Sequence, residues 1–209
     1  MTSTQPAAAE RTRSPSRRDE IVVIAKNLFA EKGYAATSTR DIADACGLLP
    51  GSLYSHFRSK AQILEMIIAP FYARLAEEQA AVLAAGGPGS DRLEAMIRRV
   101  VALCAEHPAE IRILHYDWPH VAGADDLRAL VVHGNETLDL WLRVLADGVA
   151  DGSLRATLQP EVAVRAITST IHGVLDRQRY GTRPDLVQQR GLDTLTDEVV
   201  AQLAQGLAT

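Results

Sequence analysis

Apolar residues recur at helical spacing along most of this 209-residue chain, and no other feature restricts its fold as strongly. The first such stripe occupies i, i+3, i+4, i+7 and i+8 positions and consists of Ile21, Ile24, Ala25, Leu28 and Phe29. One face of an α-helix carries this spacing, whereas a strand alternates apolar and polar residues. Because no segment shows convincing strand alternation, the sequence predicts an all-α protein.

Glycines, prolines and helix caps divide this pattern into segments. Gly33 and Gly47 are placed to end the first two helices, of which the first begins near residue 17. Longer helices are predicted over residues 60–84, 91–106, 109–117, 125–150, 160–180 and 192–207. Residues 1–16 are rich in Ser, Pro and Arg and have no period, so they are predicted to form a disordered basic tail.

The charge of the chain is unevenly distributed. Residues 1–60 contain nine Lys and Arg and six acidic residues, whereas residues 61–209 contain 13 Lys and Arg and 20 acidic residues. A basic end on an acidic body predicts that a polyanion is bound at the N-terminal end.

Several classes of protein are excluded by missing patterns. No apolar stretch approaches the length of a membrane span, and the N-terminus lacks the apolar core of a secretory signal. The two cysteines, Cys46 and Cys104, lie in apolar helical patterns, which predicts a cytoplasmic protein with reduced thiols. No metal-ligand spacing, phosphate-binding loop or nucleophile motif is present, so we expect no metal, no cofactor and no enzyme activity.

Two short helices joined by a glycine-containing turn are predicted between residues 38 and 57. Ser38 and Asp41 have the spacing of a capping box, which starts the first helix. Pro50 suits the first position of the second helix, because its missing N–H costs nothing there. Such a pair is a helix-turn-helix, whose second helix enters the major groove of DNA.

The second helix of this pair has a small, polar outer face. If Leu53 and Phe57 point inward, its outward residues are Gly51, Ser52, Tyr54, Ser55 and His56. Small side chains permit close approach to base edges, and the hydroxyl and imidazole groups can bond phosphate oxygens. Arg40 can reach a guanine edge, and Lys60 is placed for a phosphate.

Residues 33–60, GYAATSTRDIADACGLLPGSLYSHFRSK, resemble the DNA-binding signature of the TetR family of bacterial transcriptional regulators. The resemblance is dense over residues 20–66 and is architectural beyond them. It implies a helix-turn-helix domain over residues 17–64 and a helical effector-binding and dimerisation domain over residues 65–209. By motif position it implies DNA contacts from Thr39, Arg40, Pro50, Gly51, Ser52, Tyr54, Ser55, His56 and Lys60. The family usually has a small polar residue where this chain has Leu49, which bears on base preference.

The same resemblance implies a homodimer formed by the last two long helices. Their apolar and small residues give a candidate interface of Ile167, Thr170, Ile171, Val174, Leu195, Val199 and Leu203. The alternative for these residues is ordinary intrachain core. A two-fold dimer would match a palindromic operator.

The body is also expected to hold a small-molecule effector, as the interiors of helical bundles often do. The candidate pocket residues are His115, Tyr116, Trp118, Trp141, His172, Arg177 and Tyr180. The body faintly resembles regulators of lipid or steroid breakdown that sense acyl-CoA thioesters. The arginines at 177, 179, 183 and 190 would suit the phosphates of such a ligand.

These features predict a repressor that an effector releases from a palindromic operator. The alternatives are a regulator that needs no ligand, a redox-responsive regulator acting through Cys46 or Cys104, and a helical protein-interaction module. An enzyme is disfavoured.

Overall fold

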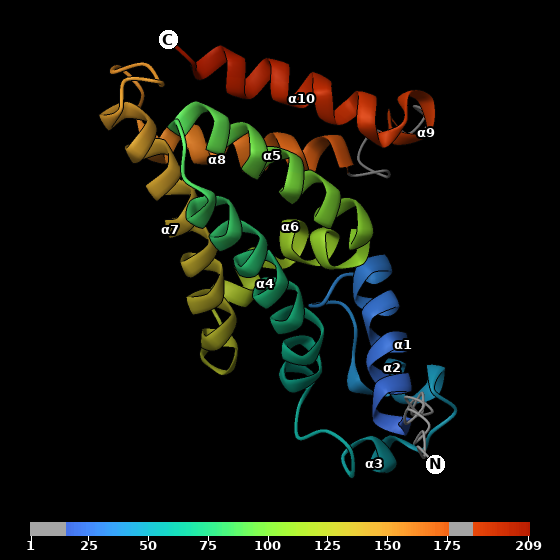
Figure 1. Cartoon of the computed structure of the whole chain (residues 1–209). Coiled ribbons are helices and arrows are strands. Elements are labelled where there is room, and N and C mark those ends of the chain that lie inside the picture. Colours follow the sequence, from blue (N-terminus) through green and yellow to red (C-terminus); the bar gives the residue numbers. More distant parts are fainter. Residues whose placement is uncertain (1–15, 176–185) are drawn as a thin grey trace, which may run out of the picture.

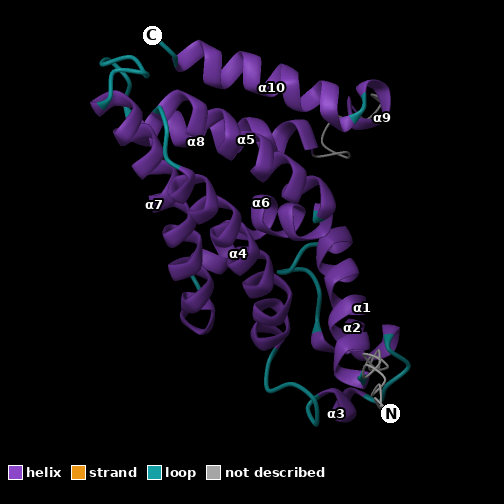
Figure 2. Cartoon of the chain, in the orientation of Figure 1, coloured by secondary structure: helices purple, strands orange, loops and turns teal. Residues whose placement is uncertain are grey.

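The computed structural model describes residues 16–175 and 186–209, and these residues are helical apart from turns and one isolated β-bridge (Figures 1 and 2). The predicted all-α class is confirmed. A head of three helices lies at one end of the molecule, and α10 lies at the other (Figure 1). The helices are α1 (Arg17–Lys32), α2 (Thr39–Ala45), α3 (Pro50–Leu53), α4 (Lys60–Ala85), α5 (Gly89–Glu106), α6 (Pro108–Ala122), η1 (Asp125–Leu127), α7 (Arg128–Ala150), α8 (Pro160–Leu175), α9 (Leu186–Arg190) and α10 (Leu192–Leu207).

Several helix bounds differ from those predicted. Pro119 lies inside α6 instead of ending it, because a proline near the exposed C-terminal turn removes little hydrogen bonding. The short helix α9 was not predicted. The predicted tail falls mostly outside the described residues, but Ser16 belongs to the head, where its hydroxyl and Asp19 form the capping box of α1.

The head has a small core of its own. Ile21, Ala25 and Phe29 of α1 are buried, as the first apolar stripe predicts. They are joined by Ile42 of α2 and by Leu53, which is 1% exposed. Packing of this core fixes α2 and α3 against α1.

Helix α4 joins the head to the body without a break, so the expected domain boundary at residues 64 and 65 lies within one continuous helix. In the body α4 packs against α5 and α7. Gln79 is fully buried between α4 and α7, where its side-chain oxygen accepts from the indole N–H of Trp141 at 2.8 Å and its amide donates to the carbonyl of Thr137. This buried link joins the two longest helices of the body.

Close packing of two glycines joins α5 to α7. A Cβ atom on Gly89 would lie 2.1 Å from the Cα of Gly148, so only glycine fits at this crossing. The chain end is held nearby, since Leu154 pairs with Ala208 in an antiparallel bridge.

Four residues of the expected dimer interface belong to the core of the single chain. Ile167 and Ile171 have no exposed surface, and Leu195 and Val199 are 3% and 4% exposed. Ile167, Ile171 and Val199 belong to the hydrophobic core cluster of the chain, and α5, α8 and α10 pack on one another. Their burial agrees with the alternative of ordinary intrachain core for these four side chains. Val174, Leu203 and Thr170 are half-buried, and the Thr170 hydroxyl donates to the carbonyl of Ala166.

Within the described residues, no helix is both long enough and apolar enough to span a membrane.

Candidate DNA-binding site

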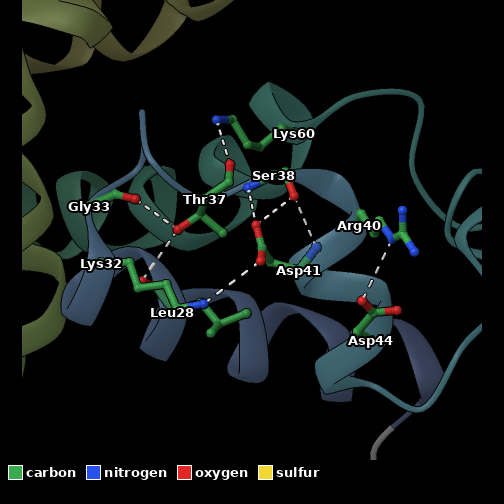
Figure 3. Close-up of polar contacts among 9 residues, drawn as sticks. All are labelled: Leu28, Lys32, Gly33, Thr37, Ser38, Arg40, Asp41, Asp44 and Lys60. Atoms are coloured by element: carbon green, nitrogen blue, oxygen red, sulfur yellow. Dashed lines mark hydrogen bonds and ion pairs between the residues drawn. The ribbon is translucent and has the colours of Figure 1, made fainter.

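The arginine at the start of α2, Arg40, is exposed to solvent. The Arg40 side chain is 81% exposed, and it pairs with Asp44 on the next turn, with Nε and Oδ2 3.9 Å apart (Figure 3). Thr39, the first residue of α2, is half-buried beside it. An exposed i, i+4 pair of this kind is weak, so the guanidinium can exchange its carboxylate for a nucleic acid.

The capping box fixes where α2 begins. The Asp41 N–H donates to the Ser38 hydroxyl at 3.1 Å, and the Ser38 N–H donates to the Asp41 carboxylate at 2.8 Å (Figure 3). The Ser38 hydroxyl and N–H, and the charge of Lys32 3.7 Å away, lower the pKa of Asp41. This box was predicted from the sequence and is confirmed.

Helix α3 points one face at solvent. Leu53 and Phe57 are buried, whereas the Tyr54 side chain is 58% exposed and its hydroxyl lies 3.3 Å from that of Thr39. Most of the predicted outward residues are exposed and the others half-buried; they are Pro50, Gly51, Ser52, Ser55 and His56. The helix is shorter than predicted, with α-helical bounds at 50 and 53 followed by turns through residue 56. Leu49 is 77% exposed just before it, a feature that hydropathy alone does not predict.

The Lys60 side chain is bonded within the head. Its ammonium donates to the carbonyls of Tyr34 and Thr37, both at 2.7 Å, and lies 4.3 Å from the centre of the Tyr34 ring. Figure 3 shows it reaching toward Thr37. With these acceptors inside the head, the ammonium holds the α1–α2 loop. The phosphate contact of Lys60 stays a prediction.

Two acidic residues of α6 dock the body onto the head, and neither was predicted from the sequence. Glu110 is 6% exposed and accepts from the Lys26 ammonium of α1 at 3.1 Å. Asp117 is also 6% exposed and accepts the N–H groups of Tyr34 and Ala35. Their spacing of seven residues places them on one face of α6, and that is the signal that was available.

The expected pocket residues do not form one group. Trp141 is core, 2% exposed, with its indole N–H bonded to Gln79. Tyr116 is 49% exposed, and it lines a small hollow between the head and α6. Trp118 packs over Gly134, 3.1 Å from the position of a Cβ there. Arg177 and Tyr180 lie outside the described residues.

Among the described candidates, His115 contacts both its chain neighbour Tyr116, with ring centroids 4.9 Å apart, and His172 of another helix. Their rings are 6.0 Å apart at a near-perpendicular angle, one on α6 and one on α8. Burial and, secondarily, the neighbouring His115 lower the pKa of His172 to about 4. His172 is therefore neutral at physiological pH. Of the arginines considered for an anionic ligand, Arg190 is paired with Glu198.

A groove of about 620 Å³ opens between α4 and α7. Its walls are largely apolar, and its polar members include Glu65, His133 and Glu136. The two carboxylates make it unsuited to the phosphates of an anionic ligand, although its volume is in the range of small-molecule sites.

Both thiols lie in surroundings that oppose reactivity. Cys46 is 8% exposed and Cys104 is 2% exposed. Burial raises the pKa of Cys46 and raises that of Cys104 to about 12. Since the thiolate is the reactive form, the redox alternative loses its support.

An exposed, hydrogen-bonding α2–α3 face beside a packed three-helix core defines a helix-turn-helix DNA-binding protein. Residues 21–67 match the family model described as bacterial regulatory proteins, tetR family, and residues 86–176 match that of the tetracyclin repressor-like C-terminal domain. The transcriptional repressor KstR2 of Rhodococcus jostii is 33% identical over 207 residues, which cover 99% of this chain and 98% of that protein. The chain therefore belongs to the TetR family of transcriptional regulators, and it is a regulator and not an enzyme.

Two solved structures share the fold. The ketosteroid transcriptional regulator KstR2 of Mycobacterium tuberculosis has a TM-score of 0.78 at 24% identity, over 94% of this chain and 97% of that one. AibR, solved in complex with isovaleryl coenzyme A and operator DNA, has a TM-score of 0.72 at 19% identity. The match covers 90% of this chain and 98% of AibR.

Proposed function

We propose that the chain is a homodimeric repressor that binds a palindromic operator in the cytoplasm and is released from it by a lipid-derived effector. The observation that carries the proposal is the exposed α2–α3 face, where Arg40, Tyr54 and the small residues around them have no competing core role. Two such heads would occupy half-sites about one helical turn of DNA apart.

The proposed contacts divide by chemistry. Arg40 reads a guanine edge or pairs with a phosphate, since its guanidinium can offer two parallel donors. The hydroxyls of Thr39 and Tyr54 bond phosphate oxygens as a pair. Gly51 allows close approach, while Pro50, Ser52, Ser55 and His56 line the remaining surface.

The DNA contacts are tested by fluorescence anisotropy with a duplex that the wild-type protein selects from a random library. Arg40→Ala is expected to weaken binding about tenfold or more and to flatten the dependence of affinity on salt. Arg74→Ala is the matched control, because its side chain is also exposed and ion-paired but lies on α4 away from the head. Equal effects of the two variants would refute the assigned face.

For the dimer, we propose the outer faces of α8 and α10 in place of the buried stripes. Val162 of α8 is 66% exposed, and Ala166 and Ser169 are exposed on the same helix. Small residues permit close packing of helices. Val162→Lys is expected to shift the protein toward monomer in analytical ultracentrifugation, and Val132→Lys, at an exposed valine of α7, is expected not to. A dimer unchanged by Val162→Lys would contradict this assignment.

The effector class is proposed from kinship. The relative KstR2 is named a ketosteroid transcriptional regulator, and AibR binds isovaleryl coenzyme A. We therefore propose an acyl-CoA or a related lipid metabolite. Isothermal titration with isovaleryl-CoA, longer acyl-CoA esters and free CoA tests this class. Heat of binding by an ester together with weakened operator binding supports it, and operator binding indifferent to every ester refutes the effector class but not DNA binding.

A further inference from the structure

The loop between α1 and α2 is held by groups of opposite charge from two other helices. From the body, Asp117 of α6 accepts the Tyr34 N–H at 2.9 Å with Oδ2 and the Ala35 N–H at 3.4 Å with Oδ1. At the start of α4, the Lys60 ammonium donates two hydrogen bonds, to the carbonyls of Tyr34 and Thr37. The carboxylate thus binds the N–H groups of the loop, and the ammonium binds its C=O groups.

The loop itself has little room to adjust. Thr37 is 1% exposed, and its hydroxyl donates to the carbonyl of Gly33 at 2.7 Å. Gly33 has a φ of +89°, and the Tyr34 ring packs edge-on against Phe29 with centroids 5.2 Å apart. A displacement of Asp117 would therefore move the loop as a unit.

The loop ends directly at the reading face. Ser38 follows Thr37 and is the N-cap of α2, and Thr39 and Arg40 come next. Three residues thus separate Ala35, which Asp117 binds, from the first proposed DNA contact. The path from body to DNA contact is a few peptide units long, and hydrogen bonds hold it at both ends.

We infer that Asp117 is a positioning residue through which helix α6 of the body sets the orientation of α2 for DNA binding. The inference rests on the proposed operator binding. A carboxylate that accepts two backbone N–H groups contributes more than a neutral acceptor, so its loss releases the loop from α6. The head keeps its own core of α1, α2 and α3, and therefore its fold.

The test compares Asp117→Ala and Asp117→Asn with Asp151→Ala in the full-length protein. Asp151 is a matched control, because it also accepts two backbone N–H groups, from Gly89 at 2.7 Å and Ser153 at 2.9 Å, but lies far along the chain from the head. Operator affinity is measured with the duplex selected by the wild type. Thermal stability and amide hydrogen exchange are measured on the same samples.

Asp117→Ala is expected to weaken operator binding at least tenfold and to expose the Tyr34 and Ala35 amides to exchange. Asp117→Asn keeps one acceptor oxygen, and its operator affinity is expected to lie between those of Asp117→Ala and the wild type. If Asp117→Ala does not fold, the test rests on the affinity of Asp117→Asn. Asp151→Ala is expected to lower stability while operator affinity stays within twofold of the wild type.

Two results would overturn the inference. One is an operator affinity of the Asp117 variants equal to that of the wild type. The other is an affinity loss in Asp151→Ala as large as theirs, which would make the effect one of global stability. A wild type that selects no duplex would instead refute the proposed operator binding, so the two failures are distinguishable.

Discussion

Replacing His172 tests the energetics of the body interior, because this half-buried imidazole, whose pKa is lowered, should make the protein's stability depend on pH. The folded chain holds the pKa of His172 at about 4, against an ordinary value of 6.5. Between pH 4 and pH 6.5 the His172 imidazole is protonated in the unfolded chain and neutral in the folded chain. Stability is therefore complete above about pH 6.5 and falls as the pH drops toward 4.

The size of this effect follows from the shift in pKa. Each pKa unit corresponds to about 1.4 kcal/mol, so His172 should cost the wild type about 2 kcal/mol at pH 5 and about 3 kcal/mol at pH 4. His172→Gln cannot take up the proton and should lose this part of the pH dependence. In His115→Gln the stability should depend less on pH than in the wild type, because the charge of His115 contributes to the lowered pKa of His172.

Urea unfolding at about pH 7.5 and pH 5, at one protein concentration, measures the effect. The quantity compared is the change in unfolding free energy between the two pH values, and not the absolute stability, which the substitution itself alters. His133→Gln is the control, since it removes a histidine whose side chain is 45% exposed on α7. If wild type and His172→Gln lose equal stability on acidification, the assignment of a neutral His172 is refuted.

Two further predictions concern packing in the body. Gly89→Ala should lower the unfolding free energy by about 3 kcal/mol, because its Cβ would overlap the backbone of Gly148; Gly206→Ala, with no atom within 4 Å of its Cβ, should not, and equal urea midpoints would contradict the close crossing. Gln79→Leu should cost about 1–3 kcal/mol, because it leaves the indole N–H of Trp141 buried without an acceptor; an unchanged midpoint would count against that hydrogen bond.

Local features of the head could be predicted from the sequence because they depend on neighbours along the chain. The capping box of Ser38 and Asp41 spans three residues, and Gly33 marks the end of α1 by adopting a positive φ. The buried stripe of α1 follows from a helical period. These signals need no knowledge of the tertiary fold.

The dimer interface could not be predicted in the same way, because an apolar stripe does not identify what covers it. Ile167 and Leu195 have the spacing of a buried face, and the sequence allowed either a partner or the chain itself to bury them. In the structure both are buried within one chain, where α5, α8 and α10 pack on one another. A helix in a bundle can bury one stripe internally and use a second, less apolar face for a partner.

Long-range polar contacts were missed for a related reason. Lys60 has the position of a phosphate contact in the linear motif, yet its ammonium binds carbonyls more than twenty residues away in sequence. Asp117 lies in another helix and reaches a loop 82 residues earlier in the chain. A charge whose partners are backbone groups has no matching charge elsewhere in the sequence. The seven-residue spacing of Glu110 and Asp117 marks one face of α6, but only the folded geometry identifies what that face binds.

These two contacts bear on how a ligand in the body could act. Helices α4 and α6 belong to the body, and each sends one charged side chain to the same short loop. A ligand that moves either helix must stretch hydrogen bonds to Tyr34, whose N–H and C=O are bound from opposite sides. Because the loop ends at the cap of α2, such strain reaches Arg40 without passing through the core of the head.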